Sequence, residues 1–152
     1  MEQGLNSGNT AFMILCTALV CLMTPGLAFF YGGLVRKKNV LTILMQSFIA
    51  VGVVTVIWIF GGFGLAFGSD HLGVIGSFTD HFALKGVGVS VHETYAQNIP
   101  FLMFFAYQLM FCIIAVPLMT GAFTARINIK GYIALLVTWT IAIYIPVNQR
   151  PR

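Results

Sequence analysis

Four long apolar runs dominate the chain, and shorter stretches between them hold its charges. The runs span about residues 11–31, 40–67, 99–123 and 132–147. Each is close to the roughly 20 residues that a helix needs to cross the hydrocarbon core of a bilayer. They are too long, and alternate too little, for the strands of a membrane barrel. A helix satisfies its backbone groups within one segment, so the pattern predicts four transmembrane helices.

Composition narrows the class further. Of the 152 residues, 59% are hydrophobic and only 8% are charged. Soluble domains average about 45–50% apolar and about 25% charged residues, so a soluble or disordered chain is excluded. Eight Lys or Arg spread over such a chain do not form the basic patch that nucleic acid requires. The predicted fold class is all-α, a polytopic membrane protein.

The positions of the charges predict an orientation. Five of the eight cations lie in the two short connections between spans: Arg36, Lys37, Lys38, Arg126 and Lys130. Short loops rich in Lys and Arg stay on the cytoplasmic side. The N-terminus and the loop 68–98 are therefore predicted to lie outside, in an extracellular or periplasmic space. The tail departs from this pattern, because Arg150 and Arg152 follow a fourth span that returns the chain to the outer side.

No Asp, Glu, Lys, Arg or His lies inside any of the four predicted spans. Proton-coupled exchangers and pumps usually keep such a group there, so this class is disfavoured. His71, His81 and His92 lie in the long loop without the spacing of metal ligands. The three cysteines lie in apolar runs and are interpreted as small buried side chains. We expect no metal site, no cofactor and no enzyme.

The third span carries an aromatic stripe. Phe104, Tyr107, Gln108 and Phe111 recur at intervals of three and four, which places them on one helical face. Tyr107 and Phe111 are one turn apart near the predicted outer end. Aromatic faces attract cations, by about 2 kcal/mol or more once the cation is desolvated. Ordinary helix packing explains the same stripe, and on spacing alone it is the stronger explanation.

Specific strings point to a family. Residues 24–39, TPGLAFFYGGLVRKKN, closely resemble the first-span signature of the ammonium transporter (Amt/Mep/Rh) family. Residues 107–111 (YQLMF) resemble its third-span Phe-Gln-x-x-Phe segment, and residues 121–126 (GAFTAR) resemble the turn that follows it. Residues 139–147 resemble its fourth span. The resemblance implies the first four transmembrane helices of an eleven-helix fold, built as two inverted five-helix halves plus a final helix.

The resemblance also implies a function. Family members are homotrimers in the cell (plasma) membrane, and each subunit has a narrow hydrophobic pore behind an aromatic outer gate. Ammonium or ammonia is then the expected substrate and the lipid bilayer the expected partner, with no nucleic acid and no cofactor. By position in the family pattern, Tyr107 and Phe111 are expected to recruit substrate and form the outer gate. The residues expected to line the pore are Leu27, Phe30, Tyr31 and Leu118.

The chain departs from the family pattern at its end. Ala125 stands where the family usually has Glu, and the residues after Val147 lack the family's His and vestibule Trp. The family's pore histidines and second gate phenylalanine belong to later spans. We therefore expect a truncated transporter that does not transport on its own. The alternative is a short, non-transporting membrane partner that associates with full-length relatives and modulates them.

Overall fold

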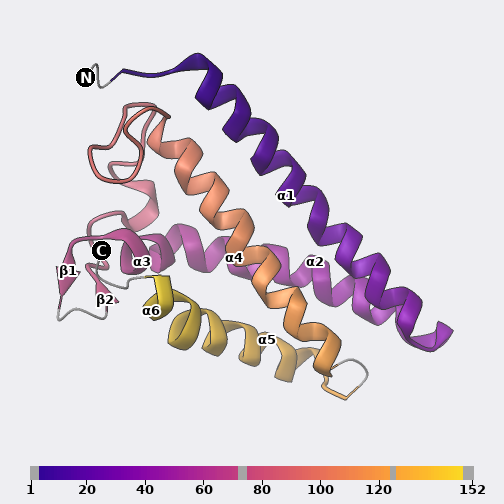
Figure 1. Ribbon diagram of the computed structural model, residues 1–152. Helices are drawn as coiled ribbons and strands as arrows, with labels where there is room; N and C mark the ends of the chain where they lie inside the picture. The colour runs from indigo at the N-terminus through magenta and orange to yellow at the C-terminus, as the bar shows by residue number, and fades with distance from the viewer. Residues whose placement is uncertain (1–3, 72–74, 124–125, 149–152) are drawn as a thin grey trace.

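A computed structural model of the chain describes residues 4–71, 75–123 and 126–148. It has four helices long and apolar enough to cross a membrane, at Ser7–Leu34, Lys37–Phe67, Phe101–Phe123 and Ile129–Asn148 (Figure 1). The predicted all-α class with four span-length helices is confirmed. Glu2, Ala125, Arg150 and Arg152 lie outside the described residues, as do the side chains of Asp70 and His71.

The first helix, α1 (Ser7–Leu34), begins at a defined cap. The side chain of Asn6 accepts hydrogen bonds from the backbone N–H groups of Gly8 at 2.9 Å and Asn9 at 3.2 Å. This satisfies two of the donors that have no partner at a helix start. The helix continues past Pro25 and ends where Val35 becomes extended. It packs against α2 and α4 along one side only, so most of its apolar surface is exposed.

The second span is a compound helix. A 3-10 turn, η1 (Lys37–Asn39), leads into α2 (Val40–Ile57), a π-helical segment η2 (Trp58–Gly62) and a last helix α3 (Phe63–Phe67). Gly61 has a φ of 152°, a conformation that side chains with a Cβ rarely adopt. The ring of Phe78 from the following loop occupies the space where a Cβ of Gly61 would lie. The glycine therefore allows the loop to pack directly onto the helix.

The remaining spans are α4 (Phe101–Phe123) and the compound helix α5 (Ile129–Trp139), η4 (Thr140–Tyr144) and α6 (Ile145–Asn148). Helix α4 lies beside α1, and α5 packs against α2 (Figure 1). The hydroxyls of Thr120 and Tyr132 lie 3.0 Å apart in a buried contact between α4 and α5. Of the four spans, helix α4 is the most buried.

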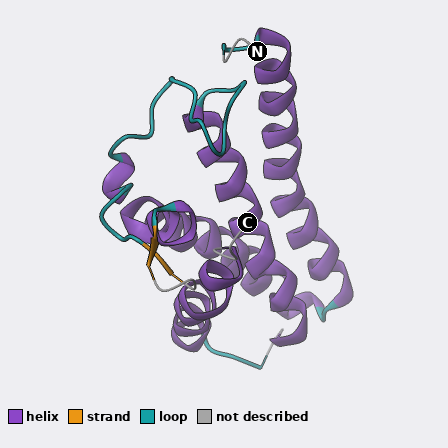
Figure 2. Ribbon diagram, turned by 60° about the vertical axis from the view of Figure 1, so that its left-hand side comes forward, coloured by secondary structure: helices purple, strands orange, loops and turns teal. Residues whose placement is uncertain are grey.

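The long loop gathers at the end of the helices near the N-terminus (Figure 2). It contains a small antiparallel pair, β1 (Asp70–His71) with β2 (Ile75–Gly76), and a 3-10 turn, η3 (Phe82–Leu84). The Asp80 carboxylate accepts from the backbone N–H of Ser69 at 2.8 Å and also from its hydroxyl. These hydrogen bonds, the one from the Ser69 side chain first, lower the pKa of Asp80.

Candidate functional site

An apolar groove of about 360 Å³ lies between α1 and α4. Its lining residues are Met23, Gly26, Leu27, Phe30, Ile114 and Leu118. Three of the four residues predicted to line a pore, namely Leu27, Phe30 and Leu118, thus lie together although they are far apart in the sequence. Phe30 is 60% exposed and Leu118 is 55% exposed, so this face has no covering partner among the described residues.

Tyr31, the fourth of these residues, is fixed beside the groove. Its hydroxyl donates a hydrogen bond to the backbone oxygen of Leu118 at 3.2 Å, and its ring centroid lies 5.6 Å from that of Phe30. A Cβ added at Gly121 would lie 2.7 Å from the Tyr31 ring. Gly121 therefore leaves the space that lets Tyr31 reach across from α1 to α4.

Tyr107 and Phe111 form an aromatic pair on α4. Their ring centroids lie 4.9 Å apart at an interplanar angle of 67°, an edge-to-face arrangement. Phe111 is 40% exposed. Positions 107, 111, 114 and 118 follow one another at intervals of four, three and four, so the pair and the groove share one face of the helix.

Phe104 does not share that environment, although it was predicted on the same face. Its ring lies 5.3 Å from that of Phe67 and 5.8 Å from that of Tyr95, both centroid to centroid. It belongs to an aromatic cluster beneath the long loop, where packing explains its position. The stripe is therefore divided: Phe104 packs in the aromatic cluster, whereas Phe111 and Leu118 further along α4 are exposed.

The exposed face combines two kinds of chemistry. The aromatic pair offers π faces, which attract cations, and the Tyr107 hydroxyl can accept a hydrogen bond. The groove offers only apolar walls, which favour a solute that can shed water. Within the described part of the chain, no group of three or more His, Cys, Asp or Glu side chains could hold a metal ion. The arrangement is suited to binding and passage.

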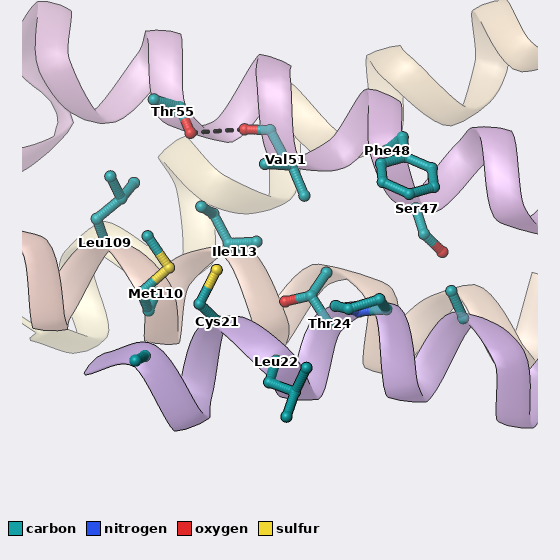
Figure 3. Close-up of a pocket in the computed structure, with 13 residues that line it drawn as sticks. Cys21, Leu22, Thr24, Ser47, Phe48, Val51, Thr55, Leu109, Met110 and Ile113 are labelled. Carbon is teal, nitrogen blue, oxygen red and sulfur yellow. Dashed lines mark hydrogen bonds between the residues drawn. The ribbon is translucent and has the colours of Figure 1, made fainter. Parts of the chain in front are cut away.

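A second groove, of about 500 Å³, lies between α1, α2 and α4 (Figure 3). Sequence reasoning missed it. The hydroxyls of Ser47 and Thr55 donate to backbone oxygens of their own helix, at 3.0 Å to Ile43 and 2.7 Å to Val51. The groove therefore presents mainly hydrocarbon. The only signal in the sequence is the run of small residues on α1 that line it, Ala18, Cys21 and Ala28 among them.

Comparison with known proteins shows which family these helices match. Residues 11–149 match the Ammonium Transporter Family. The chain is 43% identical over 155 residues to an ammonium transporter of Mycobacterium tuberculosis, an alignment that covers 93% of this chain and 32% of the relative. It is 39% identical over 140 residues to an ammonium transporter of Bacillus subtilis, covering 92% of this chain and 34% of the relative.

Solved structures agree. The crystal structure of Candida albicans Mep2 matches with a TM-score of 0.81 and 25% identity, over 95% of this chain and 31% of that one. The chain thus spans about one third of the length of the relatives that it matches. Those relatives are named transporters. The match runs through all four spans, including α1 and α4 with their shared face, and so the chain belongs to the ammonium transporter family.

Proposed function

We propose that these helices supply the outer recruitment site and one wall of a hydrophobic pathway that carries ammonium or ammonia across a membrane. One observation carries the proposal: the Tyr107–Phe111 pair lies on the same face of α4 as Leu118, which lines the apolar groove together with Leu27 and Phe30. The family membership supplies the substrate, since the relatives are named ammonium transporters.

The chemistry of the face suggests a sequence of events. A cation approaching the aromatic pair is attracted to the ring faces, and the Tyr107 hydroxyl can accept a hydrogen bond from an ammonium N–H. Beyond Phe111 the side chains of Ile114 and Leu118 are apolar, and the nearby Tyr31 hydroxyl already donates to the backbone oxygen of Leu118. An ion that keeps its charge pays the cost of desolvation there, whereas ammonia does not. Potassium is disfavoured for the same reason.

We also propose a setting for the protein. It is a multi-pass protein of the plasma membrane, with the N-terminus and the loop 68–98 outside. The cations of the short connections, Lys37, Lys38 and Lys130 among them, support this orientation. A homotrimer is proposed with it. The exposed apolar side chains of α1, such as Phe12, Leu22 and Phe29, offer surface for lipid and for further protein.

The test uses the Bacillus subtilis relative as a host. Residues 11–148 replace the matching segment, and uptake of labelled methylammonium is measured in cells that lack other ammonium transporters. Phe111→Ala should change uptake or the exclusion of potassium. Phe12→Ala is the matched control, because Phe12 is an exposed α1 phenylalanine that lines neither groove. The gate proposal fails if the two variants behave alike.

The chain alone is tested in the same cells. Its relatives are about three times as long, so we expect no uptake above an empty vector. The chain is also expressed beside the intact relative. If it purifies with the relative and lowers its transport, the function as a modulating partner replaces the transport proposal for the isolated chain.

A further inference from the structure

Two histidines of the long loop pack on the beginning of α4. The ring of His92 stacks on that of Phe101, with centroids 4.5 Å apart and an interplanar angle of 24°. The ring of His81 lies 5.4 Å from Phe101 and 6.5 Å from His92, both between centroids. Phe101 is the first residue of α4 and is only 1% exposed. Both imidazoles therefore cover a buried residue at the start of a membrane span.

The hydrogen bonds of the two rings make different demands on their protons. The backbone N–H of Thr94 donates to Nδ1 of His92 at 3.3 Å, a hydrogen bond that requires this nitrogen to carry no proton. Nδ1 of His81 lies 3.3 Å from the backbone oxygen of Lys85, which can only accept. A hydrogen bond at this position requires a proton on Nδ1 of His81. The bond at His92 exists only in the neutral form, whereas the bond at His81 exists in both.

The segment that His92 anchors also caps two helices. Residues 88–98, here called the capping turn, are closed by paired hydrogen bonds of 3.0 Å between the backbones of His92 and Ala96. The backbone oxygens of Ser90 and Gly88 accept from the first N–H groups of α4, at 3.1 and 2.9 Å. The oxygen of Asn98 accepts from the N–H of Asn6 at 3.0 Å. The capping turn thus holds the starts of α4 and α1 together.

We propose that His81 and His92 make the capping turn a pH-sensitive clasp, closed while His92 is neutral and opened when its Nδ1 takes up a proton. Protonation would place two N–H donors, those of His92 and Thr94, against each other. It would also add a positive charge beside His81 on a partly buried aromatic surface. Opening frees the first turn of α4, about two turns before Tyr107. The inference does not depend on the transport function.

Burial and the surrounding charges set the direction in which the pKa of His92 shifts. Burial first, and the neighbouring His81 second, lower the pKa of His92 below its ordinary value of 6.5, while Glu93 opposes them. Asp80 interacts electrostatically with His81, and Lys85 contacts His81 through its backbone. The Tyr95 ring also packs against His92, with centroids 5.5 Å apart. A lowered pKa means that the clasp is fully stabilised above pH 6.5 and weakens as pH falls through the lowered value.

Nuclear magnetic resonance of the ¹⁵N-labelled chain in lipid nanodiscs tests this directly. At about pH 7.5 the ¹⁵N shifts should identify His92 with its proton on Nε2. On acidification, Nδ1 of His92 should take up a proton below pH 6.5. In the same pH range the amides of Ala96 and Phe101 should lose protection from hydrogen exchange, after correction for intrinsic rates, by about tenfold or more.

Two variants separate the roles of the histidines. His92→Phe keeps an aromatic ring against Phe101 but cannot titrate, so the amide protection should no longer depend on pH in this range. His81→Phe removes an imidazole that lowers the pKa of His92, so the clasp should still open but at a higher pH than in the parent chain. Opening by Asp80 would occur only below its ordinary pKa of 3.8 and is thereby distinguished.

Three results would overturn the clasp. The first is a proton on Nδ1 of His92 at neutral pH. The second is full protection of Ala96 and Phe101 after His92 has titrated. The third is acid opening in His92→Phe at the same pH as in the parent chain. The first two are measured on the unmodified protein, so they remain decisive even if a variant fails to fold.

Discussion

Helix α4 carries aromatic residues in two environments that differ although the residue types do not. Phe101 and Phe105 near its start are almost fully buried, and their rings contact Phe63 of α3 at 5.6 and 4.9 Å between centroids. One to two turns further on, Phe111 is 40% exposed and contacts Tyr107. The first group is covered by the loop and by α3, whereas the second faces outward beside an apolar groove. The comparison teaches that burial by a partner, and not residue type, separates these two groups of aromatic side chains.

The largest effect on stability should come from a substitution among the buried aromatic residues around Phe63. Phe63→Ala removes a ring that is 1% exposed and contacts the rings of Trp58, Phe67, Phe101 and Phe105. We expect the free energy of unfolding to fall by about 3–5 kcal/mol, because the cavity cannot collapse. Phe111→Ala is the comparison and should cost about 1 kcal/mol or less. Denaturant unfolding in mixed micelles measures both, and equal losses would show that Phe111 is also a structural residue.

The joint between helix and loop should be nearly as sensitive. Gly61→Ala forces a Cβ into the space of the Phe78 ring at a φ of 152°, so we expect a loss of about 3 kcal/mol. Gly52→Ala in the same span is the control, because nothing lies within 4 Å of its added Cβ. It should be neutral or slightly stabilising. Thermal unfolding followed by size-exclusion chromatography distinguishes the two, and similar behaviour would contradict the observed packing of the loop on η2.

A smaller effect is expected between α4 and α5. Thr120→Val removes the partner of the buried Tyr132 hydroxyl and should cost about 1–3 kcal/mol. Thr17→Val is the matched control, because the Thr17 hydroxyl donates only to the backbone oxygen of Met13 in its own helix. The same unfolding assay applies. If Thr17→Val lowered the free energy of unfolding as much as Thr120→Val, the hydrogen bond between Thr120 and Tyr132 would not stabilise the contact between α4 and α5.

The smallest effect concerns the exposed part of the loop. The pKa of Asp80 is lowered by hydrogen bonds from Ser69. The contribution of this carboxylate to the stability of the loop is therefore present above pH 3.8 and is lost as pH falls through the lowered value. Asp80→Asn should remove this dependence and leave the helices intact. Exchange of the Ser77 amide, which donates to Ser69, reports on this part of the loop. An unchanged acid response in the variant would assign it to another group.

The transmembrane helices could be predicted from the sequence because their hydrophobicity is a local property. A run of apolar residues without charge identifies a membrane helix wherever its partners lie. The grouping of Leu27, Phe30 and Leu118 was expected only from the family resemblance, since no local rule connects α1 with α4. Their roles, like those of Tyr107 and Phe111, stay predictions. Helix periodicity alone placed Phe104 with Tyr107, and it could not reveal that Phe104 packs against Phe67 and against Tyr95 of the loop.

The packing of the long loop on the helices could not be predicted, because it depends on contacts between segments that are distant in the sequence. Nothing in the string around Gly61 indicates that Phe78 packs upon it, and the capping turn joins residues 6, 92 and 101 through backbone bonds that no side-chain pattern records. The sequence showed only that the histidines lie in the long loop without the spacing of metal ligands. The structure instead packs His81 and His92 against Phe101.

The π-helical segments have a consequence for how the spans are aligned and engineered. Each residue turns an α-helix by about 100°, so the wider turn at Trp58–Gly62 shifts the angular phase of everything beyond it. The same happens at Thr140–Tyr144, whose Tyr144 ring lies 6.0 Å from Trp58 between centroids. A one-residue deletion within Thr140–Tyr144 would remove the wider turn and rotate α6 relative to α5. Trp58–Gly62 also contains the non-helical Gly61, so a deletion there would displace α3 as well as rotate it. Chimeric joints therefore belong outside both segments.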